Sequence, residues 1–350
     1  MIDRRTLLNL GATSAMVWQA GCAYAPLEQP QALRKIAFGS CIDQERPQPV
    51  WDAILADRPD LFVFGGDNVY ASSQPWQLAN LQRAYAKLAS DAGFARLRQT
   101  VPHLAIWDDH DMGLNDGGAS FPHRQASKDA FVDFWRLAAD DPRRSRDGLY
   151  HASIVGPVGQ QVQIILLDTR WFRSDLRATD HRNAPGKERY LPDADPGKTM
   201  LGDVQWRWLE AQLRQPADLR LIVSGVQVIV EGHGWEAWGN FPLEQQRLLR
   251  LIQQTQAKGV VFLSGDRHIG ALYRHPRSDG YPLYELTSSG MTHAWAEARE
   301  TGPNRLGELV TENHYATLEM DWSRRSVLLS IKSVAGHTLR QQAIALTDLV

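Results

Sequence analysis

Short apolar runs that end in glycine or aspartate alternate with longer amphipathic segments along most of this chain. The runs have the length and composition of buried strands, and the segments between them have the periodicity of helices. Such alternation favours a largely parallel sheet that is covered on both faces. The expected strands are 34–40, 61–66, 101–109, 162–170, 219–229 and 259–266, and the expected helices lie near 48–57, 75–99, 124–139, 203–215 and 243–257.

The last part of the chain has a different pattern. Three runs, YATLEMDW, SVLLSIKS and QQAIALTD, are separated by short polar turns, which predicts an antiparallel meander. Residues 174–202 are polar and rich in Pro and Asp, so we expect a long surface excursion near the functional site. Residues 228–242 and 286–295 either line a cleft, with Glu236 and His293 among the side chains facing it, or pack as surface loops. We expect one domain over 34–350.

Charge and composition argue against some classes of binding partner and against a disordered chain. The 350 residues carry a formal net charge of −2, with no long run of one sign. A protein that binds a nucleic-acid backbone or an anionic membrane surface needs a basic surface patch. We therefore expect neither as a partner. Disorder is excluded because the chain is 43% hydrophobic and 22% charged, as globular domains are.

Residues 1–25 have the features of an export signal. Paired arginines precede a moderately apolar stretch that is too short to span a membrane, and AYA fits a cleavage site. Paired arginines are typical of the pathway that exports folded proteins. QAGC also resembles a lipoprotein box that would attach lipid to Cys22, although Gln19 fits its first position poorly. We therefore expect a periplasmic or lipid-anchored protein; the alternative is a cytoplasmic amphipathic start.

The expected strand ends carry side chains that metals prefer. They are Cys41, Asp67, Tyr70, Asp108 to Asp111, Asp168, Arg170, Asp266 and His268. A single aspartate at a strand end is more often a cap or turn residue, but ligands of open α/β sheets bind beyond the carboxyl ends of strands. Carboxylates massed there repel one another unless cations neutralise them. Thiolate, phenolate and imidazole suit a transition or trivalent ion and carboxylates a divalent one, so we expect two different metals.

Five motifs occur in a characteristic order: FGSC, GGDNVYA, IWDDHDMGLNDGG, LLDTRWFR and LSGDRH. Together they resemble the alkaline phosphatase D (PhoD-like) family of calcineurin-like metallophosphoesterases, over roughly residues 34–345. The resemblance implies an α/β fold, namely a four-layer αββα sandwich with mixed sheets. It also implies a two-metal site between the loops of the sheets and a catalytic domain over 34–350.

The resemblance implies two ions that share Asp67 as a bridging ligand. The first is Fe(3+), with the further ligands Cys41, Tyr70 and His268. The second is divalent, with Asp109 and Asp266 as ligands. Ca(2+) is the family expectation for this second ion, and Mn(2+) and Zn(2+) are alternatives.

The family pattern also assigns residues that would contact substrate. His110 matches a histidine that contacts the transferring phosphoryl group, and Arg170 resembles an arginine that binds the substrate phosphate. Asp108 is expected to be structural. Further positions, as ligands, neighbours of ligands or substrate contacts, are Asn68, Asp111, Asn115 and Gln227. Gln227 stands where the wider superfamily has a histidine.

The resemblance implies hydrolysis of small phosphate monoesters or diesters by a metal-activated hydroxide. We expect an exported monomer, with a membrane contact only through a lipid on Cys22. One alternative is a metal-binding envelope protein without catalysis, but such a protein would have lost His110 and Arg170. The other is a nuclease, which the charge balance argues against.

Overall fold

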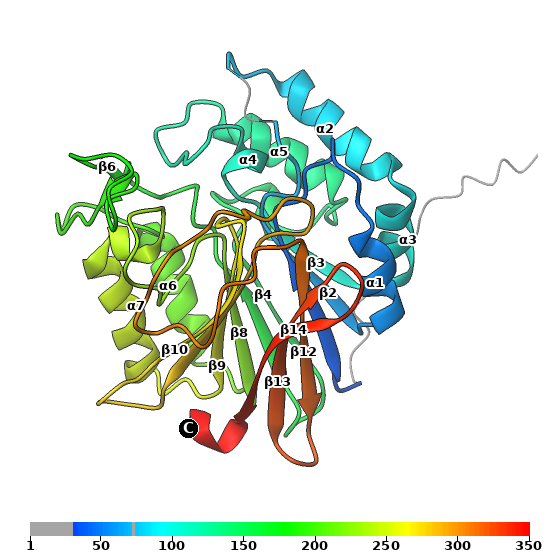
Figure 1. Cartoon of the computed structure of the whole chain (residues 1–350), viewed down its shortest axis with the longest axis vertical. Coiled ribbons are helices and arrows are strands. Elements are labelled where there is room, and N and C mark those ends of the chain that lie inside the picture. Colours follow the sequence, from blue (N-terminus) through cyan, green and yellow to red (C-terminus); the bar gives the residue numbers. More distant parts are fainter. Residues whose placement is uncertain (1–30, 72–73) are drawn as a thin grey trace, which may run out of the picture.

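The computed structural model describes residues 31–71 and 74–350 of the chain. Within these ranges the chain folds into two six-stranded mixed sheets (Figure 1). The expected export signal, residues 1–25, and Cys22 lie outside the described residues. In the described part, every helix is too short or too polar to cross a membrane.

The first sheet combines the first strands of the chain with the last ones. Its strands are β1 (Lys35–Gly39), β2 (Leu61–Gly65), β3 (His103–Ile106), β12 (His314–Asp321), β13 (Ser326–Ser333) and β14 (Thr338–Ala345). They lie in the order β14-β13-β12-β1-β2-β3. β1, β2 and β3 pair in parallel, while β12, β13 and β14 form an antiparallel meander. The C-terminal meander expected from the sequence is therefore confirmed.

The second sheet comes from the middle of the chain. Its strands are β4 (His151–Val155), β5 (Val162–Leu166), β8 (Leu219–Ser224), β9 (Val260–Ser264), β10 (Gly270–His275) and β11 (Leu283–Ser288). The order is β10-β11-β9-β8-β5-β4, with four parallel strands in the centre and an antiparallel strand at each edge. The alternation of strands and helices thus predicted the parallel strands of each sheet. Each sheet is mixed because it also contains antiparallel strands.

Helices cover the outer faces of the two sheets (Figure 1). The α-helices of the described residues are α1 (Val50–Asp57), α2 (Leu78–Ser90), α3 (Ala92–Thr100), α4 (Asp109–Met112), α5 (Arg124–Phe134), α6 (Gly202–Leu213) and α7 (Pro242–Gln254). α1 and α3 lie outside the first sheet, and α6 and α7 lie outside the second. The four-layer arrangement implied by the family resemblance is confirmed.

Side-chain alternation along the strands divides the apolar core into two parts. In β8, Leu221 and Val223 belong to the large cluster that joins the two sheets and extends under α1 and α3. Ile222, which points to the opposite face, packs with Trp206 of α6 and Leu248 of α7. Because successive residues of a strand face opposite sides, a fully apolar strand is what a sheet buried on both faces requires.

Three local features differ from the sequence expectation. The expected helix 75–99 is divided at Asp91, whose side chain accepts a hydrogen bond from the backbone N–H of Phe94 and caps α3. The expected strand 219–229 ends at Ser224, and at the following residue, Gly225, a Cβ atom would lie 2.2 Å from Asp108 Oδ1. The edge strands β4 and β10 and the inner strand β11 were not predicted.

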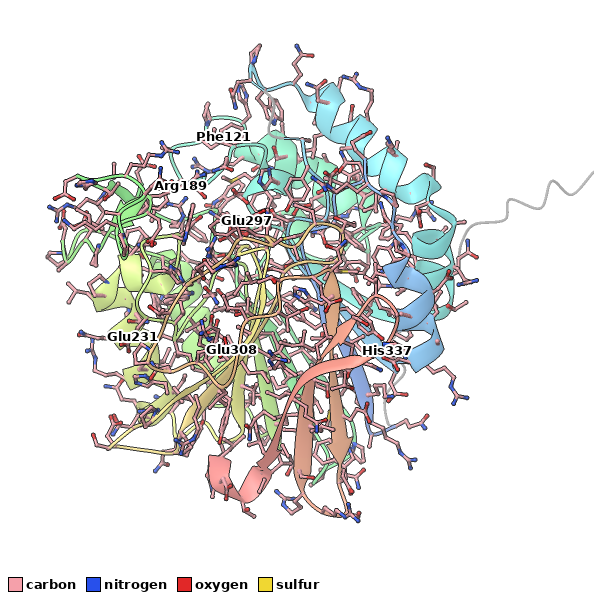
Figure 2. All side chains as sticks on the ribbon, in the orientation of Figure 1. Phe121, Arg189, Glu231, Glu297, Glu308 and His337 are labelled. Carbon is pink, nitrogen blue, oxygen red and sulfur yellow. The ribbon has the colours of Figure 1, made fainter. Side chains whose placement is uncertain are left out.

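The excursion 174–202 contains only two short paired strands, β6 (Arg177–Ala178) and β7 (Tyr190–Leu191). Figure 2 shows Arg189, which precedes β7, on the side of the molecule that carries β6. Arg189 also lines the cavity described below, so the prediction that this excursion lies near the site is confirmed.

A stability test follows from the aromatic packing beneath the first sheet. Phe94 of α3 is fully buried, and its ring lies 5.5 Å from Trp51 and 5.9 Å from Phe64. Phe94→Ala should lower the free energy of unfolding by about 3–5 kcal/mol, because it leaves a cavity among rigid rings. Urea unfolding measures the change. The control Val158→Ala, at a side chain 91% exposed, should change stability by less than about 0.5 kcal/mol. Equal stability of the two variants would contradict this packing.

Candidate metal centre

The expected ligands come from both sheets and meet in one place. Cys41 follows β1, Asp67 follows β2, Asp109 begins α4 just after β3, and Asp266 and His268 follow β9. Ligand atoms of Cys41, Asp67 and His268 all lie within 4.8 Å of one another. The same limit holds for the group formed by Asp67, Asp108, Asp109 and Asp266. Asp67 belongs to both groups, as a residue that bridges two ions would.

The side chains of the first group touch directly. The Tyr70 hydroxyl donates to Asp67 Oδ2 at 3.2 Å and lies 3.0 Å from His268 Nε2. Cys41 Sγ is 3.6 Å from the same Asp67 oxygen. Cys41 is buried and unpaired, so its thiol is free to bind a metal. These residues supply sulfur, phenol, imidazole and carboxylate donors, the set that suits a transition ion.

The backbone at these residues is strained. Cys41, Asp67, Asp266 and His268 all have positive φ angles, of 63°, 48°, 70° and 55°. Residues other than glycine rarely adopt this left-handed conformation, and such strain persists only where surrounding structure imposes it. Four of the expected ligands share it, which indicates that the fold holds their side chains toward a common point.

Two glycines before Asp67 make the turn possible. A Cβ atom on Gly65 would lie 2.7 Å from the Phe38 ring, and one on Gly66 would lie 2.6 Å from Asp108 Cβ. Gly66 also has a φ of +104°, which favours glycine. The strand can therefore turn against β1 and the Asp108 backbone only without side chains at these positions.

The protein's own charges balance the crowded acids only in part: burial opposes ionisation of Asp109, but His110 and Arg170 keep its pKa below the usual range. Burial, and then the neighbouring carboxylate of Asp109, raise the pKa of Asp67 well above its usual range. Burial and then Glu236 raise the pKa of Asp266 in the same way. Burial and Asp67 likewise raise the pKa of the Cys41 thiol. Bound cations would reverse these shifts, because they favour the ionised forms. The donor set and its electrostatics therefore fit metal ions.

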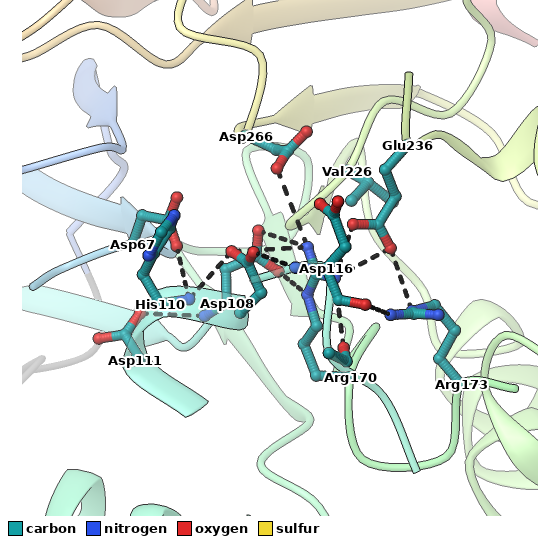
Figure 3. Close-up of polar contacts among 12 residues, drawn as sticks. Asp67, Asp108, His110, Asp111, Asp116, Arg170, Arg173, Val226, Glu236 and Asp266 are labelled. Atoms are coloured by element: carbon teal, nitrogen blue, oxygen red, sulfur yellow. Dashed lines mark hydrogen bonds and ion pairs between the residues drawn. The ribbon is translucent and has the colours of Figure 1, made fainter. Parts of the chain in front are cut away.

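Arg170 is not exposed to substrate, which corrects the expectation that it binds the substrate phosphate. Its side chain is completely buried, and its guanidinium contacts Asp108 through Nε and Nη2 and Glu236 through Nη1 (Figure 3). Nη2 also lies 3.9 Å from Asp109 and 4.0 Å from Asp266. Arg170 therefore braces the acids from behind.

Glu236 completes this buried network. Its carboxylate lies 2.8 Å from Arg170 Nη1 and 3.1 Å from Arg173 Nε, and all three side chains are at most 1% exposed. The sequence left two options for the loop 228–242, a wall facing substrate or packing at the surface. Glu236 also lines the cavity, but its role in the network comes from residues far away in the chain, so sequence spacing gave no signal for it.

Asp111 and Asn68 hydrogen-bond to each other, and Asn68 Oδ1 is buried without a hydrogen-bond partner among the described residues. Asp111 accepts hydrogen bonds from the backbone N–H groups of Asn68 and Asp108 and from the Tyr85 hydroxyl. Burial raises the pKa of Asp111 to about 7, although these donors oppose the shift. The Asn68 side chain donates to Ile106 O and to Asp111. Asp108 pairs with Arg170, in agreement with the expected structural role.

Gln227 lies outside the centre, contrary to the suggestion that it replaces a superfamily histidine. Its amide donates to the hydroxyls of Tyr273 and Thr287, and its oxygen lies 3.0 Å from His233 Nε2. Asp168 is also outside, because it accepts backbone hydrogen bonds from its own turn and from Leu149. The polar groups of both side chains have hydrogen-bond partners within the protein, as polar groups in turns and cores usually do.

An open cavity of about 210 Å³ gives access to the centre. Asp67, Asp109, Asp266 and His268 line one part of it, together with His110 and the exposed Asn115. The His110 ring packs on Tyr70, with centroids 4.2 Å apart, and its backbone N–H donates to Asp67 and Asp109. His110 and Asn115 thus lie where a substrate could reach them.

Comparison with known families agrees with this geometry. The family model described as PhoD-like phosphatase matches residues 36–325. The chain belongs to this family. Alkaline phosphatase D of Bacillus subtilis (strain 168) is 25% identical over 240 residues, which are 62% of this chain and 40% of the relative. The chain therefore spans less than half the length of that curated relative.

Solved structures with a similar fold include members of this family and others. A structure of PhoD has a TM-score of 0.71 at 17% identity, covering 92% of this chain and 70% of the other. The purple acid phosphatase PPD1 from yellow lupin seeds has a TM-score of 0.60 at 12% identity. The match covers 91% of this chain and 55% of PPD1. GAP50, the anchor in the inner membrane complex of Plasmodium, has a TM-score of 0.55 at 12% identity. The match covers 90% of this chain and 89% of GAP50. These likenesses concern the fold.

The buried network of this PhoD-like domain predicts that Glu236 contributes to stability. Glu236→Gln removes the charge that faces two buried arginines, so the free energy of unfolding should fall by about 3–5 kcal/mol. Urea unfolding of the metal-loaded protein measures it. Glu297→Gln, at an exposed glutamate labelled in Figure 2, is the control and should cost less than about 0.5 kcal/mol. A Glu236→Gln protein as stable as this control would rule out the bracing role.

Proposed function

We propose that this PhoD-like protein is a metal-dependent phosphoesterase that hydrolyses small phosphate monoesters or diesters. The observation that carries the proposal is the meeting of acids, a thiol, a phenol and an imidazole from both sheets around Asp67. Membership of a family described as phosphatases supports the same reaction class. The natural substrate and the preference for monoester or diester belong to the proposal, because less than half of the curated relative is covered.

The described residues divide into two ligand sets. Cys41, Tyr70 and His268 with Asp67 would hold Fe(3+), while Asp109 and Asp266 with Asp67 would hold a divalent ion, Ca(2+) by preference or else Mn(2+) or Zn(2+). When bound, such a pair of cations lowers the pKa of water and neutralises phosphoryl oxygens.

The remaining chemistry falls to the chain's own side chains. His110 is half-buried, packs on Tyr70 and lines the cavity, so its ring lies where a bound phosphate could contact it. In this position it can hydrogen-bond a phosphoryl oxygen or donate a proton to the leaving alkoxide. Arg170 acts at a distance, by keeping Asp108, Asp109 and Asp266 in place.

The proposal includes the location and the assembly state. We propose an exported monomer whose membrane contact is confined to a lipid on Cys22, and whose substrates are small molecules. A nuclease would use a basic surface along the nucleic-acid backbone, and the net charge of −2 argues against it. A metal-binding protein without catalysis would not need His110 at the cavity.

The role of His110 can be separated from metal binding. His110→Ala should lower kcat for a nitrophenyl phosphate ester by about 10²–10⁴-fold, because a hydrogen-bond or proton donor is lost, while metal content stays unchanged. Steady-state kinetics and elemental analysis of the same preparation give both quantities. His337→Ala, at an exposed histidine, is the control and should alter neither. Parallel loss of metal and kcat would make His110 a ligand.

The ligand role of Tyr70 has an optical signature. Phenolate bound to ferric iron absorbs visible light, so the iron-loaded protein should be coloured and Tyr70→Phe should lose most of that absorbance. A visible spectrum with iron analysis is the measurement. Tyr284→Phe removes a hydroxyl that accepts a hydrogen bond from Arg274 away from the centre and should keep the colour. A Tyr70→Phe protein with unchanged colour per iron would exclude Tyr70 as a ligand.

A further inference from the structure

The cavity at the metal centre has a second, positively charged part. Besides the acids, its lining includes Arg189, Trp235, Arg267 and Trp295. These residues come from the excursion 174–202, the loop after β8 and the segments that follow β9 and β11. A phosphate ester that occupies the cavity would therefore be near both the metal ligands and these basic and aromatic side chains, which together form a wall of the cavity.

The two arginines of this wall differ in what they can bind. Arg267 is 7% exposed at its side chain and forms a buried ion pair with Glu300. Arg189 is 37% exposed, and its Nη1 lies 3.7 Å from Asp116 Oδ2. That separation is longer than a charge-assisted hydrogen bond of about 2.7–2.9 Å. Within the described residues, Arg189 is therefore the cavity arginine whose guanidinium is accessible to an anion.

Backbone contacts fix the position of Arg189. The N–H groups of Arg189 and Tyr190 both donate to Gly234 O, at 3.0 and 2.8 Å. The Gly234 N–H donates in return to the Glu188 carboxylate. A Cβ atom on Gly234 would lie only 2.6 Å from the Glu188 nitrogen, so the two segments approach closely at this glycine. The excursion is thereby attached to the loop that carries Trp235.

The side chain of Arg189 is also oriented. Its guanidinium carbon lies 5.1 Å from the centroid of the Trp235 ring, within the range of a cation–π contact. The Trp295 ring meets Trp235 edge to face at 5.4 Å, which supports this platform. Asp116, the acid beside Arg189, is itself held by the Tyr190 hydroxyl at 2.5 Å. A flexible surface arginine would lack these supports.

We propose that Arg189 binds the phosphate group of the substrate, the role that the motif pattern assigned to Arg170. The inference rests on the proposed phosphoesterase function and makes the excursion 174–202 a substrate-binding element. A planar guanidinium suits phosphate because its N–H groups match two phosphate oxygens at once. Asp116 keeps the guanidinium at the cavity and releases it to the more highly charged phosphate.

The test is direct binding of inorganic phosphate to the metal-loaded full-length protein by titration calorimetry. Arg189→Gln should weaken phosphate binding by about 10- to 100-fold, the effect expected for loss of a charged hydrogen-bond donor. Arg189→Lys keeps the charge without the planar fork and should fall between Arg189→Gln and the wild type. Arg182→Gln, at an exposed arginine of the same excursion that does not line this cavity, is the matched control and should bind phosphate normally.

Kinetics separate this inference from the proposed function. With a nitrophenyl ester, Arg189→Gln should raise KM by a similar factor while its urea-unfolding midpoint matches that of Arg182→Gln. If the wild type hydrolyses the ester and Arg189→Gln binds phosphate within twofold of the wild type, the inference is wrong and the function stands. If the metal-loaded wild type hydrolyses no phosphate ester, the proposed function fails, and calorimetry still decides whether Arg189 binds phosphate.

Discussion

Mutual repulsion among buried carboxylates is the constraint on which the rest of this structure depends. Asp67, Asp109 and Asp266 are drawn from three strand ends in two sheets and placed within a few ångströms of one another. A pair of like charges about 4 Å apart costs about 4 kcal/mol at an effective dielectric constant of about 20. Arg170 offsets part of this repulsion from the buried side. The open side of the cluster faces the cavity, where cations and then substrate phosphate would bind.

The fold is organised to hold that arrangement. Parallel strands end at the same edge of each sheet, which brings the ligand-bearing turns together. The turns themselves are strained, since Cys41, Asp67, Asp266 and His268 have positive φ angles, and close contacts across glycines such as Gly66 keep them in place. Metal binding would offset both the backbone strain of these turns and the repulsion among the carboxylates. Stability and function are therefore coupled at this centre.

The sequence places the candidate ligands in local motifs at the ends of expected strands. The structure brings Cys41, Asp67 and His268 together, and likewise Asp67, Asp109 and Asp266, while their role as metal ligands stays a prediction. The motif assigned Arg170 to the substrate phosphate, but the arginine is buried against Asp108 and Glu236, which lie 62 and 66 residues away in the chain. Gln227 was misassigned because its partners come from β10 and β11, strands that the sequence did not predict. Local patterns thus predict candidate ligands, while contacts between distant segments decide which side chains face the cavity.

The central claim is that paired cations lie among these acids, and anomalous X-ray diffraction tests it most directly. Data collected on either side of the iron absorption edge from crystals of the metal-loaded protein should give one anomalous peak within bonding distance of Cys41 Sγ, Tyr70 Oη and His268 Nε2. A second ion should lie beside Asp109 and Asp266, with Asp67 between the two. Crystals of protein that contains iron by analysis, but with no peak at Asp67, would contradict the account.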